Sequence, residues 1–148
     1  MAKIEASVMI DRPIEDVWKF TSDTSKIPKW ITEVLELRQT STGPLGVGAT
    51  FEFREKMRNT SMTVSSRVTE CEPNRRLSFE HLSGPGKGST ITFNMDTVEG
   101  KTKFTSTNDM KFSGFYKLLG PFVTPSLRRA VISSLDNAKR ILESEAKS

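Results

Sequence analysis

The sequence has little cysteine and little histidine, the residues that form disulfides and most zinc sites. Its 148 residues include one cysteine, Cys71, and one histidine, His81. A single thiol cannot form an internal disulfide, and these two residues cannot build a cysteine-rich zinc site. Cys71 ends a predicted strand just before Pro73, and a nucleophilic thiol there would need His81 as its partner. We therefore expect no metal, no cofactor and no catalytic cysteine.

Long apolar runs are also missing. No stretch of the sequence comes near the roughly 20 apolar residues that a membrane-spanning helix needs. The first residues, Met1 to Glu5, contain no apolar segment before a small-residue cleavage site, as a signal peptide would. We expect a cytoplasmic protein without a transmembrane segment.

Charge of one sign does not dominate the sequence. It contains 22 lysines and arginines against 18 acidic residues, which gives a formal net charge of +4. The basic residues are spread along the chain rather than gathered with aromatic residues, so we expect no nucleic-acid binding. A chain of this length fits one domain over residues 1–148, because it can bury enough surface for a single core. Its oligomeric state is left open between monomer and homodimer.

What the sequence does contain is a series of segments in which apolar and polar residues alternate. This period of two is typical of antiparallel strands with one buried face and one exposed face. Short turns rich in glycine, proline and asparagine separate most of these segments. The predicted strands are residues 4–10, 33–39, 50–57, 62–69, 76–81, 91–95 and 104–110.

Helical patterns occur after the first strand and at the end of the chain. Asp11-Arg12-Pro13 leads into a short amphipathic helix, and a second helical turn follows Ser22-Asp23 and ends near Trp30. Gly120-Pro121 and Thr124-Pro125 then interrupt an apolar stretch before a long helix, which is expected to begin near Ser126. Its apolar stripe repeats at helical spacing. That stripe consists of Leu127, Val131, Leu135, Ala138 and Leu142.

The predicted elements follow the order of the α+β helix-grip fold: one strand, two short helices, six strands and one long helix. The sequence resembles the START-like superfamily, specifically its polyketide cyclase/dehydrase and lipid-transport branch (SRPBCC). The resemblance lies in residues 10–18, the spacing from Asp23 to Trp30, residues 43–49 and the ending 118–142, and it covers essentially the whole chain. It implies a curved, seven-stranded antiparallel sheet around the long C-terminal helix, with an apolar cavity between them.

Strand alternation places many phenylalanines and methionines on the face that would meet the helix. Aromatic rings supply flat walls and methionine adapts to irregular shapes, so these residues suit a small-molecule pocket. An ordinary filled core is the alternative. The residues expected to line the cavity are Trp30, Phe51, Phe53, Met57, Met62, Phe79, Phe93, Met95, Phe104, Asn108, Met110, Phe115, Phe122, Val131 and Leu135.

The same alternation turns a few polar residues inward, above all Glu55 and His81. Ser66, Ser106 and Asn108 share this face. An unpaired carboxylate there would have to find a partner, reach water or take up a proton. A carboxyl and an imidazole in one apolar pocket are plausible acid and base partners, so Glu55 and His81 are candidate catalytic residues. Alternatively the strand bulges at Glu55, or His81 lies in solvent at the end of the sheet.

The function that we expect first is binding of a small hydrophobic or aromatic molecule, such as a lipid or a polyketide-like metabolite. The alternative is a cofactor-independent enzyme of the cyclase or dehydratase type that uses Glu55 and His81. Sequestration of a toxic metabolite and binding of a protein partner are further alternatives. The segment 112–129 is expected to form a lid over the cavity mouth, with Trp30 at the opposite lip, and weak contact with a membrane surface is the other interpretation of this segment.

Overall fold

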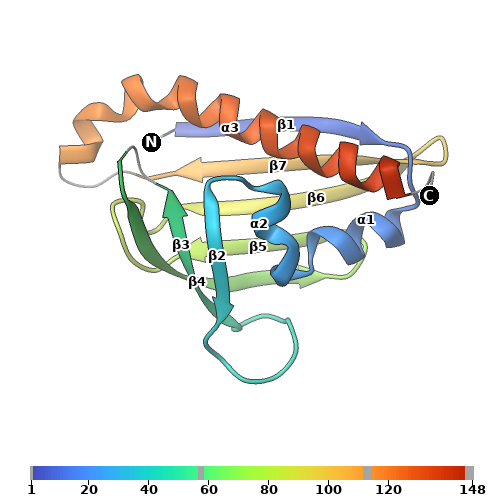
Figure 1. Cartoon of the computed structure of the whole chain (residues 1–148), viewed down its shortest axis with the longest axis horizontal. Helices are drawn as coiled ribbons and strands as arrows, with labels where there is room; N and C mark the ends of the chain where they lie inside the picture. Colours follow the sequence, from blue (N-terminus) through green and yellow to red (C-terminus); the bar gives the residue numbers. More distant parts are fainter. Residues whose placement is uncertain (1, 57–58, 112–114, 146–148) are drawn as a thin grey trace.

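The computed structural model describes residues 2–56, 59–111 and 115–145, and it describes side chains over residues 3–56, 59–111 and 124–145. The chain begins with a strand, crosses to the next strand through short helical segments, and ends in a long helix, as Figure 1 shows. The elements are β1 (Ala2–Ile10), α1 (Ile14–Thr21), the 3-10 turn η1 (Thr24–Lys26), α2 (Ile27–Trp30), β2 (Val34–Gln39), β3 (Thr50–Lys56), β4 (Ser61–Glu72), β5 (Arg76–His81), β6 (Thr90–Val98), β7 (Lys101–Met110) and α3 (Phe115–Glu145).

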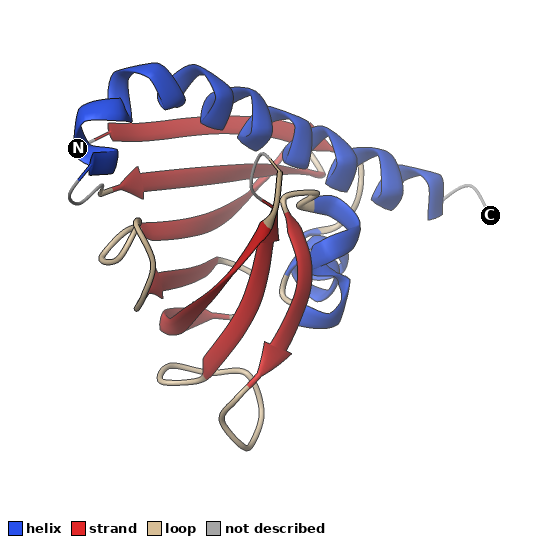
Figure 2. Ribbon diagram, turned by 60° about the vertical axis from the view of Figure 1, so that its left-hand side comes forward, coloured by secondary structure: helices blue, strands red, loops and turns tan. Residues whose placement is uncertain are grey.

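The strands form one antiparallel, seven-stranded sheet in the order β1-β7-β6-β5-β4-β3-β2. Its register shifts between Val34 and Glu36 and again between Val68 and Glu70. Irregularities of this kind bend strands and increase their twist. The sheet curves so that β2 and β3 turn across the end of the other strands (Figure 2). The α+β helix-grip fold expected from the sequence is confirmed.

The short helical segments between β1 and β2 cover one end of the concave face. In α1, Val17 and Phe20 are buried against the core. Asp23 starts the next turn, where its side chain accepts a hydrogen bond from the Ser25 backbone N–H at 3.1 Å. Because α2 follows this turn at once, Trp30 at its end reaches the interior of the molecule.

The C-terminal helix is longer than the sequence pattern predicts. The expected start near Ser126 is wrong, because α3 is helical from Phe115 and continues for 31 residues through Pro121 and Pro125. Each proline removes one backbone donor and crowds the preceding turn, which commonly bends a helix without ending it. The helix axis curves over these first turns (Figure 1). Among the described residues, no helix is both long and apolar enough to cross a membrane.

Two side chains fasten the C-terminal half of α3 to the region around the end of β1. Arg12 donates from Nη1 to the Leu142 carbonyl at 2.5 Å, and Lys139 donates from Nζ to the Met9 carbonyl at 2.6 Å. On the same half of the helix, Leu142 is fully buried against the sheet. This end of the molecule is therefore closely packed, and any space between helix and sheet lies under the preceding turns of α3.

Candidate functional site

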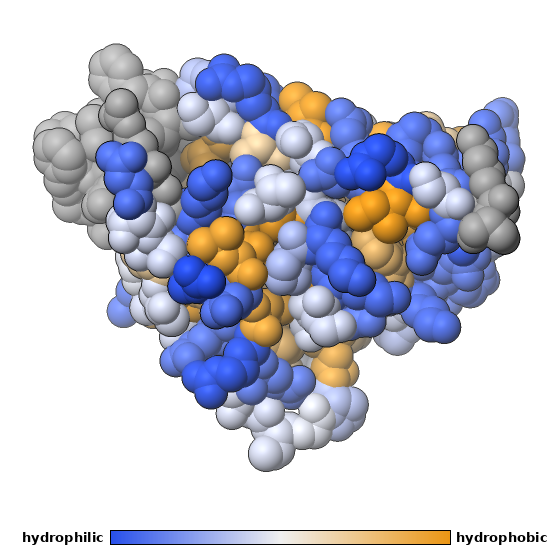
Figure 3. All heavy atoms as spheres, viewed as in Figure 1, coloured by the Kyte–Doolittle hydropathy of each residue, from blue (hydrophilic) through white to orange (hydrophobic). Residues whose placement is uncertain are grey.

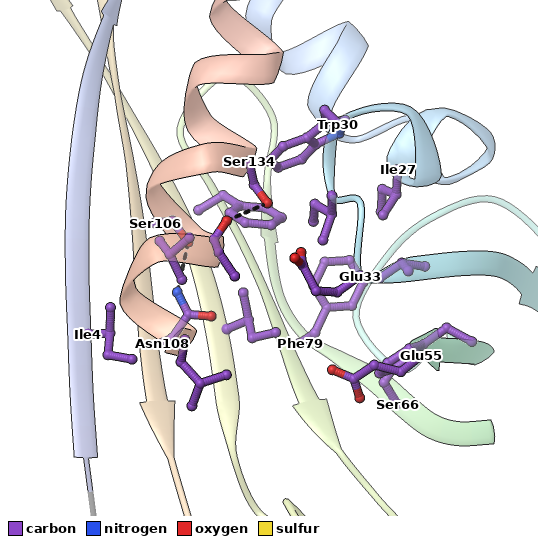
Figure 4. Close-up of a pocket in the computed structure, with 18 of the residues that line it drawn as sticks. Ile4, Ile27, Trp30, Glu33, Glu55, Ser66, Phe79, Ser106, Asn108 and Ser134 are labelled. Carbon is purple, nitrogen blue, oxygen red and sulfur yellow. Dashed lines mark hydrogen bonds between the residues drawn. The ribbon is translucent and has the colours of Figure 1, made fainter. Parts of the chain in front are cut away.

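A cavity of about 140 Å³ lies between the concave face of the sheet and α3. Its walls come from β1 to β7, from α2 and from α3 residues 127–135. Figure 4 shows side chains from the sheet, α2 and α3 pointing into this common space. The lining residues are Ile4, Ile27, Trp30, Ile31, Glu33, Val34, Leu37, Phe53, Glu55, Ser66, Phe79, His81, Ile91, Phe93, Ser106, Asn108, Met110, Leu127, Ala130, Val131, Ser134 and Leu135.

The cavity wall is mainly apolar. On the outside of the molecule, apolar surface also lies over β2 among hydrophilic residues (Figure 3). Phe79 and Phe93 meet edge to face, with ring centroids 6.4 Å apart. Trp30 lies against Phe93 at 5.2 Å. Of the apolar residues expected at the site, the cavity is lined by Trp30, Phe53, Phe79, Phe93, Met110, Val131 and Leu135.

Four other residues expected at the cavity do not line it. Phe51, Met95 and Phe104 have exposed fractions of 1%, 2% and 0%, and they are packed inside the core. Met62 is partly buried near the turn at Gly84. Alternation assigns a side chain to a face of the sheet, but it does not distinguish positions in the packed core from positions at the cavity. Met57 and the side chains of Phe115 and Phe122 lie outside the described residues, as do the other apolar side chains of the expected lid up to Val123. Leu127, in the same segment, lines the cavity.

Trp30 is part of the cavity wall rather than an exposed lip. Its exposed fraction is 1%, and its ring contacts Phe93 and Phe104. Its carbonyl accepts a hydrogen bond from Asn137 Nδ2 at 3.2 Å, which joins the end of α2 to α3. Its Nε1 is buried and has no acceptor among the described residues. The indole is thus held in place mainly by its apolar contacts.

Glu55 extends from β3 into the cavity, where the alternation of that strand directs it. Neither a hydrogen bond nor an ion pair joins its carboxylate to another described residue. Burial raises the pKa of Glu55, and the nearby charge of Glu33 raises it further. The carboxyl group therefore holds a proton at a higher pH than an ordinary glutamate does.

Glu33 is a cavity residue that the sequence pattern does not reveal. It lies just before β2, and its carbonyl accepts a 2.7 Å hydrogen bond from the Lys56 backbone N–H. This bond fixes the start of β2 beside the end of β3, where Val34 pairs with Glu55. Figure 4 shows the carboxylates of Glu33 and Glu55 both directed into the space below α3. The predicted strand 33–39 includes Glu33, but its alternation does not tell where this side chain points, because the register shifts between Val34 and Glu36.

His81 closes β5 and lines the cavity with an exposed fraction of 7%. Its ring meets Phe53 edge-on, with centroids 5.4 Å apart. Two backbone hydrogen bonds of 2.9 Å join His81 to Gly88 and Ser89, so the end of the strand is ordered rather than open to solvent. Burial lowers the pKa of His81 and so favours its neutral imidazole. No hydrogen bond links this ring to the described residues.

A second group of polar atoms lies on the far wall, on β7 and α3. Asn108 donates from Nδ2 to Ser106 Oγ at 2.9 Å, and its side-chain oxygen turns toward the cavity (Figure 4). Ser134 uses its hydroxyl hydrogen within α3, where it donates to the Ala130 carbonyl at 2.9 Å. The oxygens of Asn108 and Ser134 are therefore available as acceptors.

This arrangement can hold an apolar molecule and offer it a carboxyl group, a neutral imidazole and several oxygen acceptors. A carboxyl with a raised pKa and an imidazole with a lowered pKa could also exchange protons with a bound molecule. Over the described ranges, no three histidine, cysteine, aspartate or glutamate residues are grouped so that they could hold a metal ion.

Comparison with known proteins places this cavity in a wider context. The structure is similar to that of TTHA0849 from Thermus thermophilus, with a TM-score of 0.82, 16% identity, and coverage of 97% of this chain and 99% of that one. The structure is also similar to that of the Zhui aromatase/cyclase from Streptomyces sp. R1128, with a TM-score of 0.81 and 13% identity. This match covers 98% of this chain and 95% of that one. A third similar structure is that of the di-domain ARO/CYC StfQ of the steffimycin biosynthetic pathway, with a TM-score of 0.80 and 15% identity. This match covers 99% of this chain and 52% of that one.

Identities this low show a shared fold. No curated protein sequence matches the chain significantly. The sequence profile described as "Polyketide cyclase / dehydrase and lipid transport" matches residues 1–144, almost the whole length. On this match, and with a helix-grip fold that encloses an apolar cavity, the chain belongs to the polyketide cyclase/dehydrase and lipid-transport family.

Proposed function

We propose that the protein reversibly binds a small hydrophobic or aromatic molecule between its sheet and α3. The observation that carries this proposal is the cavity itself, with its apolar wall and a few polar groups. Small-molecule sites in proteins have this composition. A volume of about 140 Å³ is comparable to that of an engineered apolar cavity of about 150 Å³ that binds benzene. One ring with a small substituent fits without rearrangement.

The polar groups in the wall support a binding site over an imperfectly filled core. Burying a carboxyl or an imidazole without a partner costs free energy, and a packed core normally avoids it. Glu55 and His81 both line the cavity without a hydrogen-bond partner among the described residues. Groups of this kind are expected where a ligand or water supplies the missing partner.

A thermal-shift titration with the neutral aromatic molecules toluene and indole tests the proposal. We expect both to raise the melting temperature of the wild-type protein. Val131→Phe fills part of the cavity and should remove this rise. Ile132→Phe is the matched control, because Ile132 is the next residue of α3 and is 44% exposed. This variant should respond like the wild type.

Native mass spectrometry of protein expressed in a metabolite-rich host complements the titration. A bound molecule that is retained by the wild type and lost from the Val131→Phe variant would support the site. An unchanged thermal response in Val131→Phe would place the ligand elsewhere. Empty protein together with no stabilisation by any apolar molecule would refute the binding function.

A second candidate function is proton-transfer catalysis on a bound polyketide-type substrate. The observation that favours it is the opposite displacement of two pKa values in one cavity: that of Glu55 is raised and that of His81 is lowered. Such a pair suits a protonated general acid and a neutral general base. Cyclisation and dehydration by this route would need no further reactive group in the wall.

Turnover of a linear polyketide-type substrate by Glu55→Gln and His81→Ala tests this candidate. Both variants should lose at least about a hundredfold in rate, the usual contribution of a positioned acid or base. Their affinity for toluene should stay near that of the wild type. Unchanged turnover in both variants would remove these residues from any reaction.

A further inference from the structure

Several oxygens that face the cavity can accept hydrogen bonds, and two of them belong to carboxyl groups. The carboxylates of Glu33 and Glu55 occupy the wall formed by β2 and β3. On the opposite wall, the Asn108 side chain presents its oxygen and the Ser134 hydroxyl has already donated within α3. The donors in the wall are neutral groups: the indole N–H of Trp30, which has no acceptor among the described residues, the hydroxyls of Ser66 and Ser106, and the ring of His81.

Among the described residues, the same wall carries no basic side chain. Within the described part of the chain, neither lysine nor arginine lines the cavity. The arginines of β2 and β3 point away from it, because Arg38 pairs with Glu52 and Arg54 pairs with Glu36, and all four side chains are at least 39% exposed. An anionic ligand would enter a mainly apolar space beside two carboxyl groups, with no cation among the described lining residues to compensate its charge.

We propose that the ligand is a small hydrophobic molecule carrying a protonated amine, which pairs with Glu33 and Glu55, and that the cavity discriminates against a carboxylate on the same carbon skeleton. This inference rests on the proposed binding function and specifies its ligand class. A cation between the carboxylates would supply the charge-assisted hydrogen bonds that Glu55 lacks among the described residues. It would also remove the mutual repulsion of Glu33 and Glu55.

The ring of His81, which has no hydrogen-bond partner among the described residues, supports the same ligand class independently of the carboxylates. This imidazole is 93% buried, given its exposed fraction of 7%, and it faces the cavity. In its neutral form it offers one acceptor and one donor, and Phe53 beside it offers a ring face or edge. A ligand that combines an aromatic ring with a donor group matches this wall as well.

Three molecules with the same eight carbons test the proposal: 2-phenylethylamine, 2-phenylethanol and phenylacetate. Each is titrated into ¹⁵N-labelled protein at pH 7 while the indole N–H signals are followed. The Trp30 signal is identified by its loss in Trp30→Phe, and Trp18 gives the other signal. We expect the amine to bind about tenfold or more tighter than the alcohol, as charge-assisted hydrogen bonds allow, and phenylacetate to bind more weakly than the alcohol.

The double variant Glu33→Gln/Glu55→Gln removes both charges at nearly unchanged side-chain volume. It should lose the preference for the amine over 2-phenylethanol, because only the amine carries the positive charge that the two carboxylates attract. The matched control is Glu36→Gln/Glu52→Gln, which makes the same charge change on the same two strands at side chains that are 73% and 39% exposed. The control should keep the amine preference.

The possible outcomes distinguish a failure of the amine preference from a failure of the proposed binding function. Tighter binding of phenylacetate than of the alcohol would overturn the inference while leaving the binding function intact, and so would an amine preference that survives the double variant. Binding of none of the three molecules, with none of the neutral aromatic molecules stabilising the protein, would overturn both.

Discussion

The charge of Glu33 raises the pKa of Glu55, its neighbour across the β2–β3 edge of the cavity. Burial has the larger effect on this pKa, but the second carboxylate works in the same direction. Two like charges are thus kept together at one end of an otherwise apolar space. A purely structural core has no need of such an arrangement, and a ligand that donates protons or carries positive charge would relieve it.

The raised pKa of Glu55 predicts a stability that falls as the pH rises. The unfolded chain loses this proton around the ordinary value of 4.5, whereas the folded protein retains it to higher pH. Between these two pKa values the folded state binds more protons, so the free energy of unfolding decreases with increasing pH. Glu55→Gln should remove this decrease and gain stability relative to the wild type, by about 1.4 kcal/mol for each unit by which the pKa is raised.

Urea unfolding of both proteins from pH 4 to pH 8 measures this difference. Glu52→Gln is the control, because Glu52 lies on the same strand but on the outer face, where it pairs with Arg38. A stability difference between Glu55→Gln and wild type that stays constant over the whole range would contradict the raised pKa.

The ionisation of His81 should make the free energy of unfolding rise with pH, opposite to the effect of Glu55. Its pKa is lowered from 6.5 by burial, so on acidification the unfolded chain takes up a proton before the folded protein does. The free energy of unfolding therefore falls as the pH drops from 6.5 to the folded-state pKa, and the contribution is fully present above 6.5. His81→Gln should lessen the loss of stability on acidification, which urea unfolding at closely spaced pH values can measure. Because the sequence has no other histidine, an identical pH profile in the variant would show that His81 titrates normally.

The affinity for an amine should increase with pH across the same range. Among the described residues that line the cavity, the ionisable groups are Glu33, Glu55 and His81. Raising the pH removes a proton from Glu55 and disfavours a positive charge on His81, and both changes favour a bound cation. Titration of 2-phenylethylamine at pH 5 and pH 7.5 should show tighter binding at pH 7.5, whereas the affinity for 2-phenylethanol should change little. Equal pH dependence of the two ligands would argue against pairing with the carboxylates.

Most of the fold could be predicted because its strands obey a simple alternation. The positions of Phe53, Glu55 and His81 on the inner face follow from that alternation and from the antiparallel register. The depth of each position does not follow, since Phe51 and Phe104 have the same orientation and yet lie in packed core. Depth depends on where the helices pack against the sheet, which only the three-dimensional packing determines.

The missed features have local causes. Glu33 is the first residue of the predicted strand 33–39 but precedes β2, and its position results from the backbone hydrogen bond to Lys56 and the irregular register that follows. The early start of α3 was missed because Pro121 and Pro125 are poor helix residues by local preference, and a long helix can absorb them as a bend. At both places the chain departs from the regular spacing of a strand or a helix, so the sequence pattern does not predict the structure there.

The free energy of unfolding should depend strongly on Arg12, which lies at the closely packed end of α3. Its guanidinium joins the Leu142 carbonyl to Asp16, at 2.5 Å and 2.9 Å, and the side chain is only 19% exposed. Hydrogen bonds that involve a charged group contribute roughly 1.5–3 kcal/mol when they are shielded from water, so Arg12→Ala should lower the free energy of unfolding by about that amount. The matched control is Arg38→Ala, because the 74% exposed Arg38 also pairs with a carboxylate, and it should cost less than about 1 kcal/mol. Equal losses in urea unfolding would mean that Arg12 is no more than a surface ion pair. A larger loss in Arg12→Ala, with toluene binding retained, would show that the packed end of α3 stabilises the fold independently of the cavity.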